Sequence, residues 1–173
     1  MKKLYLLFVM ALASGCVPHL DDENTNKKVM GYKPVYIDYA SARKIEVQKA
    51  RSLSHPGKIY IKGNYLYVGE AGEGIHIFDN TDKASPKPVA FISIPVNKDI
   101  SIKGNILYAD NADDLVTIDI SDLQKIKVLK RIEKAFPFPS FPNEIGWFEC
   151  VNPNKGYVKG WEYVELLNPK CRR

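Results

Sequence analysis

Histidine is the first residue type in this chain that could carry acid–base chemistry, and none of its copies stands in a catalytic pattern. His19 lies in a polar N-terminal stretch, His55 directly precedes a proline, and His76 is flanked by Ile75 and Ile77. The sequence has no nucleophile elbow, no zinc-helix spacing of histidines and no glycine-rich phosphate loop. We expect His76 to point outward from a strand. The sequence therefore predicts no catalytic residue, no metal site and no cofactor.

Carboxylates gather once, at Asp110, Asp113 and Asp114. An EF-hand calcium loop starting at Asp110 would need glycine and glutamate where the chain has Leu115 and Ser121, so the calcium pattern fails. A polysaccharide-cleaving enzyme needs two acids about 5 to 10 Å apart in a cleft. Asp110 with Asp113 or Asp114 is the pair that the sequence offers, and an envelope polysaccharide-active enzyme is the alternative function.

Aromatic residues concentrate near the C-terminus, where eight of the nineteen lie between Phe136 and Tyr163. Aromatic faces exposed together can stack on sugar rings or form a patch for a partner protein. The same residues can instead cover an open sheet face as a core or lid, which is the structural interpretation we favour. The candidate binding surface consists of five residues: Trp147, Phe148, Tyr157, Trp161 and Tyr163.

Two cysteines, Cys150 and Cys171, remain after the N-terminal region. We expect them to form a disulfide, because no ligand partner stands at metal-site spacing and an exported chain meets an oxidising environment. Closing a loop of this size stabilises a fold by about 3 kcal/mol.

The N-terminus has the form of a bacterial lipoprotein signal. Residues 1–16 combine two lysines, a short apolar stretch and a small-residue cleavage site that ends in Cys16. Cys16 would then carry the lipid, and residues 17–31 would form a flexible tether. Val17 after the cysteine implies the outer membrane, on its periplasmic face or at the cell surface. An ordinary secretory peptide is the alternative.

The remaining residues, 32–173, have the length of a single domain with a modest core. The formal net charge is +5, of which Lys2 and Lys3 contribute two charges, and the other lysines are spread along the chain. This excludes a basic patch of the nucleic-acid-binding kind, so we expect no nucleic acid partner.

An internal repeat sets the architecture. Residues 61–67 recur as residues 102–108 at a spacing of 41, and residues 77–82 recur as 117–122 at a spacing of 40. A period of about 40 residues with alternating apolar positions is typical of four-stranded propeller blades. We predict an all-β fold with two four-stranded blades, at about 58–94 and 98–134. The expected strands are 58–61, 65–69, 74–79, 87–94, 99–102, 106–109, 115–120 and 126–132.

The segments outside the repeats contain further elements. Residues 34–37 and 45–49 alternate like strands, and Asp38 is placed to cap a short helix that runs to Arg43. Residues 136–142, FPFPSFP, favour an extended segment over a surface. Residues 147–151 and 157–166 predict an aromatic C-terminal hairpin.

Leu115-Val116-Thr117-Ile118-Asp119 is similar to the repeat named LVIVD after its consensus, and residues 75–79 are a looser match. With the signal at Cys16, the chain resembles LVIVD-repeat lipoproteins of the Bacteroidetes, which are mostly of unknown function. The resemblance implies a propeller-type fold and attachment to the membrane through a lipid anchor. It covers about residues 58–134.

Two blades cannot close a ring. The blades form a small sandwich face to face, which we favour, or several chains complete a ring, or the chain is an incomplete propeller. The most consistent function is a non-enzymatic binding or scaffold module for a protein or glycan partner.

Overall fold

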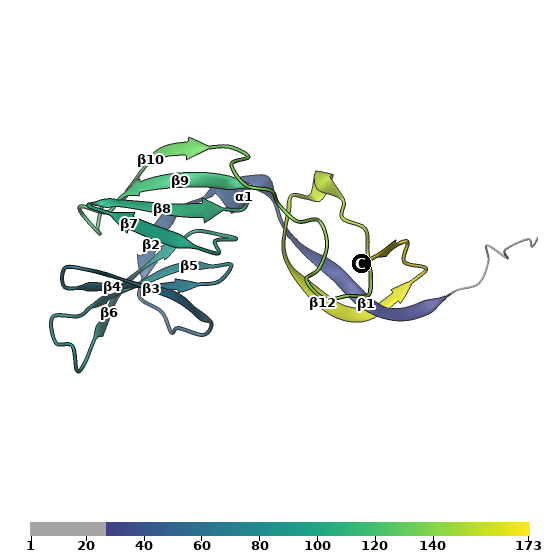
Figure 1. Cartoon of the computed structure of the whole chain (residues 1–173), viewed down its shortest axis with the longest axis horizontal. Coiled ribbons are helices and arrows are strands. Elements are labelled where there is room, and N and C mark those ends of the chain that lie inside the picture. The colour runs from purple at the N-terminus through teal and green to yellow at the C-terminus, as the bar shows by residue number, and fades with distance from the viewer. Residues whose placement is uncertain (1–26) are drawn as a thin grey trace, which may run out of the picture.

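The structure is a computed structural model that describes residues 27–173, and these form three β-sheets in two lobes (Figure 1). The predicted signal, Cys16 and the tether up to residue 26 lie outside the described residues. The blade lobe contains two sheets built from the repeats, and the terminal lobe contains one sheet built from both ends of the described chain. The all-β prediction is confirmed.

The first blade has five strands in the order β2-β6-β5-β4-β3. The four repeat strands lie where the sequence predicts them: β3 (Pro56–Lys62), β4 (Tyr65–Glu70), β5 (Gly74–Asp79) and β6 (Lys87–Ser93). The fifth, β2 (Glu46–Lys49), pairs antiparallel with β6. The prediction of four strands is therefore wrong for this blade, because β2, although expected as a strand, joins the sheet through a long-range pairing.

The second blade has four strands in the order β10-β9-β8-β7, as predicted. Its strands are β7 (Ile100–Lys103), β8 (Ile106–Asn111), β9 (Asp114–Asp119) and β10 (Lys127–Ile132). The Gly-Asn turns that open each repeat need a left-handed residue, and Gly63 and Gly104 adopt φ of 56° and 57°.

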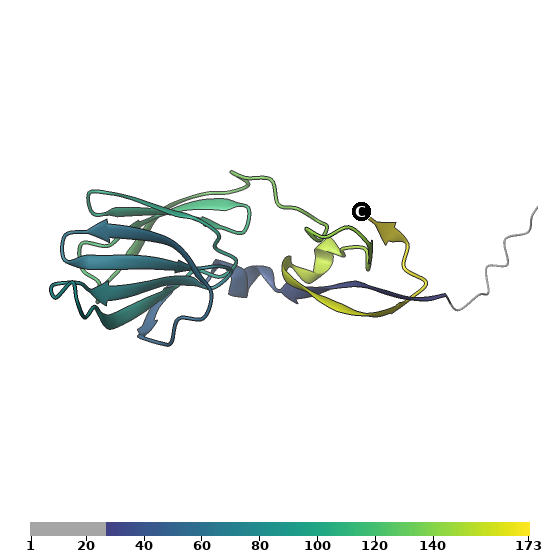
Figure 2. The same cartoon turned by 60° about the horizontal axis from the view of Figure 1, so that its bottom comes forward.

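The two blades pack face against face over one core (Figure 2). Each blade has two faces, which we call front and back. The front of the first blade carries Tyr67 and Ile75, and the front of the second carries their repeat equivalents, Tyr108 and Leu115. The back is the opposite face of each blade. The core joins the front of the first blade (Tyr67, Ile75, Ile77, Ala90, Ile92) to the back of the second (Ile100, Ile102, Leu107, Ala109, Val116, Ile118). Non-equivalent faces meet, as they do between consecutive blades of a propeller.

The terminal lobe is built around β1 (Lys28–Ile37), which lies between β12 (Tyr157–Leu167) and the short β11 (Trp147–Phe148). β12 runs antiparallel to β1 over its whole length, β11 runs parallel to it, and β13 (Cys171–Arg172) pairs with β11. The prediction of a C-terminal hairpin is wrong, because β1 separates the two aromatic segments. Residues 28–31, predicted as tether, instead form the start of β1.

Short helices link these parts. Helix α1 (Tyr39–Arg43) connects β1 to the blades, and Asp38 caps it by accepting a hydrogen bond from the Ser41 amide at 2.9 Å, as predicted. The 3₁₀ helix η1 (Pro153–Lys155) precedes β12. Neither helix in residues 27–173 has the length and apolar character needed to cross a membrane.

Candidate functional site

A groove lies where the terminal lobe meets the loops of the blade lobe. Its volume is about 420 Å³. Both aromatic and polar side chains line it, and we call it the aromatic groove. Its aromatic residues are Tyr32, Phe138, Phe141 and Trp161, and its polar side chains are Lys98, Asn143, Glu144 and Lys159.

The sheet of the terminal lobe positions one wall of the groove. Trp161 stands on β12 opposite Pro34 of β1, and its ring meets Phe148 edge to face with centroids 5.7 Å apart. Tyr32 of β1 packs against Tyr163 at 5.0 Å. Aromatic pairs prefer tilted and edge-to-face contacts, so Phe148 and Tyr163 help to orient the Trp161 and Tyr32 rings.

The proline-rich segment forms the other wall. Residues 136–142 belong to no helix or strand and bend at Phe136, Ser140 and Phe141, because proline at every second or third position excludes helix and ladder pairing. Phe138 lies under the ammonium of Lys98 at 5.5 Å. Phe141 lies under the guanidinium of Arg173 at 4.8 Å, and Arg173 also donates to the carbonyls of Pro142 and Asn143. The C-terminal arginine thus fixes this wall.

The five aromatic residues predicted as one surface do not lie together: three share one part of the terminal lobe, Trp147 lies between two cations, and Tyr157 lies at the junction of the lobes. Phe148, Trp161 and Tyr163 lie together on the sheet of the terminal lobe, with Phe148 buried and Tyr163 60% exposed. Trp147 lies between two cations, with Lys27 at 4.9 Å and Arg172 at 5.4 Å from its ring. Only Trp161 lines the aromatic groove. The sequence did not identify Tyr32, which arrives from β1 through long-range pairing.

Tyr157 serves the junction between the lobes. Its ring packs on Tyr39 at 4.9 Å and on Phe138 at 5.1 Å, and its hydroxyl donates to the carboxylate of Asp113. Burial and the neighbouring carboxylate raise the pKa of Tyr157. Tyr157 is therefore a structural residue of the interface between the lobes.

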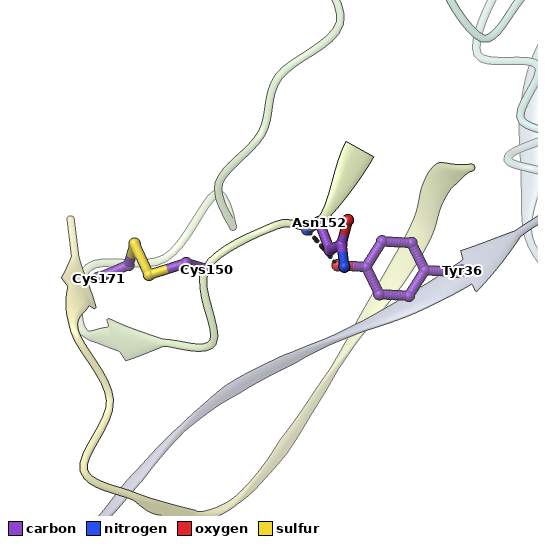
Figure 3. The surroundings of a disulfide bond; sticks show 4 residues. All are labelled: Tyr36, Cys150, Asn152 and Cys171. Carbon is purple, nitrogen blue, oxygen red and sulfur yellow. Dashed lines mark hydrogen bonds between the residues drawn. A yellow bond between two sulfur atoms is a disulfide. The ribbon is translucent and has the colours of Figure 1, made fainter. Parts of the chain in front are cut away.

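The predicted disulfide between Cys150 and Cys171 is present, with Cα atoms 5.3 Å apart (Figure 3). It lies next to the pairing of β11 with β13 and closes the end of the terminal lobe. Nearby, the Asn152 amide donates to the Tyr36 hydroxyl at 2.8 Å (Figure 3), which ties the segment after Cys150 to β1.

The acids of the 110–114 cluster all hold the fold together. Asp110 Oδ1 accepts from the amides of Lys98 and Asp99 at 2.9 and 2.8 Å, and from the Asn97 side chain at 2.8 Å, so it caps the turn between the blades. Asp113 accepts from Tyr157, as described above.

Asp114 is buried and bound to two arginines. Its Oδ2 lies 2.7 Å from Arg131 Nη1 and 3.4 Å from Arg43 Nη2, and its Oδ1 accepts from the Lys134 amide at 3.0 Å. Burial disfavours its ionised form, but these hydrogen bonds and charges more than compensate and lower its pKa. A general acid needs a raised pKa, so Asp114 is poorly suited to that role.

A second buried polar cluster lies on the back of the first blade. Glu70 accepts hydrogen bonds from Ser54 Oγ at 2.5 Å and Arg51 Nη2 at 2.9 Å, and it pairs with His76 Nε2 at 2.8 Å. His76 packs edge to face on Phe91, and the Arg51 guanidinium lies 3.7 Å from the centroid of the Phe91 ring. We expect from the sequence that His76 points outward from the strand, and it does lie on the back face, away from the core between the blades. It is nevertheless buried, because the segment carrying Arg51 and Ser54 covers this part of the face. In a catalytic triad the histidine lies between the serine and the acid, whereas here the Glu70 carboxylate lies between Ser54 and His76. The cluster therefore does not have the arrangement of a triad.

A larger cavity of about 720 Å³ lies between β3 of the first blade and the second blade. It is lined by Ile59 and Tyr60 of β3, by Ser101, Tyr108 and Leu115 of the second blade, and by Phe136 and Pro137. Within residues 27–173 no three histidine, cysteine or acidic side chains lie together in a way that could hold a metal ion.

The comparison with protein families agrees with this geometry. The family model described as LVIVD repeat matches residues 55–90 and 97–129. The chain contains two LVIVD repeats. Each match covers most of one blade, and β2 and the terminal lobe lie outside both. Searches of curated proteins and of solved structures found no match.

Proposed function

We propose that the protein is a non-enzymatic binding module of the bacterial envelope, held at the outer membrane by a lipid on Cys16, and that it binds a glycan in the aromatic groove. The groove is the observation that carries the proposal. Its volume of about 420 Å³ falls within the range of about 300–1,000 Å³ typical of small-ligand sites. Ring faces there can stack on a sugar, and the amide and charged groups can bind its hydroxyls.

The position of β1 supports an anchored module. β1 starts at the end of the terminal lobe that is farthest from the blades (Figure 1). An anchor upstream of β1 would therefore leave the blades pointing away from the membrane, on the periplasmic face or at the cell surface. The disulfide is consistent with an oxidising compartment.

The alternative, an envelope polysaccharide-active enzyme, has less support from the acids. Asp99 and Asp110 both line the larger cavity, yet Asp99 is bound to Lys58 Nζ at 2.6 Å and its pKa is lowered by that hydrogen bond. Asp110 accepts three hydrogen bonds on one oxygen. A retaining or inverting pair needs one acid that keeps its proton near neutral pH.

Tryptophan fluorescence tests the groove. The chain has two tryptophans, so in a Trp147→Phe background the emission reports Trp161 alone. We expect soluble peptidoglycan fragments or N-acetylglucosamine oligosaccharides to change this emission in a saturable way. Phe141→Ala should weaken binding at least tenfold, while Phe136→Ala should leave it unchanged. The two phenylalanines are matched, being 43% and 42% exposed in the same segment, but only Phe141 lines the groove.

An unchanged emission with every envelope glycan would reject glycan binding at this site. If Phe141→Ala instead removed a protein captured by chemical crosslinking in intact cells, the groove would be a site for a partner protein.

A further inference from the structure

Equivalent isoleucines of the two blades differ sharply in burial. Ile59 and Ile61 on the back of the first blade are 64% and 65% exposed, while their repeat equivalents Ile100 and Ile102 are 5% and 8% exposed. The residue type is the same, and only the neighbour differs. The front of the first blade covers the second pair. On the back of the first blade the segment with Arg51 and Ser54 covers Glu70, His76 and Phe91, but it leaves Ile59 and Ile61 open.

The exposed isoleucines belong to a continuous apolar face. In the sheet register Ile61 lies beside Leu66, Leu66 beside Phe78, and Phe78 beside Pro88. The corresponding row of the second blade, Ile102, Leu107 and Ile118, lies in the core. This row, in which Ile61 is exposed and Leu66 and Phe78 are half-buried, is thus the counterpart of a row that a blade front already covers within this chain.

The front of the second blade is the matching open surface. Tyr108 and Leu115 are half-buried and Ile132 is 46% exposed, whereas their equivalents in the first blade are at most 1% exposed. Those equivalents, Tyr67, Ile75 and Ile92, are the residues that receive the back of the second blade. The cavity of about 720 Å³ is lined by Tyr108 and Leu115 together with Ile59 and Tyr60 of β3, so it opens onto this surface beside the edge of the first blade.

The chain leaves the second blade along the path by which it leaves the first. The Phe136 amide donates to the Asp113 carbonyl at 2.9 Å, as the Val96 amide donates to the Gly72 carbonyl at 2.7 Å. After Val96 the chain enters a new blade, and after Phe136 it turns into the terminal lobe. That lobe lies beyond the ends of the blade strands, so it does not cover the open front (Figure 1).

We propose that the open part of the first blade's back, which carries Ile59, Ile61 and Leu66, binds the front of the second blade of another copy of this chain, so that copies associate head to tail. The contact is heterologous and leaves one open face at each end, so it can extend into a ring or a short row. On the front of the second blade Lys130 and Thr117 occupy the positions that Ala90 and Ile77 have in the first blade. The contact between copies is therefore more polar than the contact between the two blades of one copy. The association is therefore reversible and rises with concentration. It does not depend on the aromatic groove.

The test uses the full chain purified in a non-ionic detergent, with its mass measured by light scattering after subtraction of the detergent. The measured mass of the wild type should rise above that of a single chain as the protein concentration rises. Ile61→Glu and Ile132→Glu should each remain a single chain, because each places a charge on one of the two faces. Ile145→Glu is the matched control, because Ile145 is 83% exposed in the terminal lobe, and it should associate like the wild type. A melting temperature equal to that of the wild type would show that each variant is folded.

Mixing the two variants distinguishes the modes of contact. Ile61→Glu retains an intact front of the second blade, and Ile132→Glu retains an intact back of the first blade. One copy of each variant can therefore bind the other through these two faces, so the mixture should form a heterodimer and no larger species. A wild type that stays a single chain at every concentration would overturn the proposal. So would an Ile132→Glu variant that associates like the wild type, because a back-to-back contact would then be at work.

Discussion

His76 Nε2 lies 2.8 Å from Glu70 Oε2, and both side chains are 2% exposed. A carboxylate can only accept, so the imidazole donates from Nε2. Glu70 also binds Ser54 and Arg51, so it fastens the segment before β3 onto the back of the first blade. Burial alone would raise the pKa of Glu70, but these hydrogen bonds outweigh burial and lower the pKa well below its usual value.

Replacing Glu70 by glutamine should reduce both stability at neutral pH and the acid sensitivity of the fold. The folded-state pKa is depressed, so the contribution of Glu70 is fully present above the unfolded-state pKa of about 4.3 and is lost as pH falls below that value. We expect Glu70→Gln to cost about 2 kcal/mol at pH 7 and to flatten the fall in stability below pH of about 4.3. Urea unfolding at pH 7 and at acidic pH measures both.

Glu73→Gln is the control, because Glu73 shares Arg51 at 3.3 Å but its side chain is 57% exposed. Equal effects of the two substitutions would show that the buried network has no special role.

Removing the disulfide should destabilise the terminal lobe. Cys150 and Cys171 are 21 residues apart, and releasing such a loop costs about 3 kcal/mol in the chain-entropy model. We expect the Cys150→Ser/Cys171→Ser double variant to melt several degrees lower in calorimetry, with the loss confined to the lobe of β1 and β12. Mass spectrometry without reduction should detect the crosslinked peptide pair in the wild type. Two freely alkylated thiols in the native protein would contradict the prediction.

Gly74 should tolerate no side chain. Its φ is 141°, and a Cβ there would lie 2.1 Å from the Ile92 carbonyl oxygen and 2.8 Å from the Ile94 amide. We expect Gly74→Ala to cost about 3 kcal/mol or more, because backbone atoms of β6 would have to move. Gly72→Ala, at φ of 82° but with no atom within 4 Å, should cost only about 1–2 kcal/mol from the left-handed backbone. Thermal unfolding of the two variants separates the steric clash from backbone strain.

Replacing Cys16 by serine tests the anchor. The wild type should incorporate labelled fatty acid and fractionate with the outer membrane, because several acyl chains on one residue hold a protein there firmly. Cys16→Ser should lose the label and the membrane association. An unlabelled wild type that still stays with the membrane would defeat the prediction, and release of an unlabelled soluble protein would indicate an ordinary secretory signal.

The local pattern of the sequence determined the elements of this protein. Alternating residues and Gly-Asn turns placed all eight repeat strands, and Asp38 placed the start of α1, because period and capping depend on residues close in the chain. The single pair of cysteines outside the signal indicated the disulfide.

Tertiary structure decided which segments meet. Parallel pairing of β11 with β1, and the addition of β2 to the first blade, join residues far apart in sequence, and no local pattern specifies such partners. The same holds for the aromatic groove, to which β1 brings Tyr32. Burial of His76 followed from a covering loop, since alternation assigns a side chain to a face of the strand but does not say what covers that face.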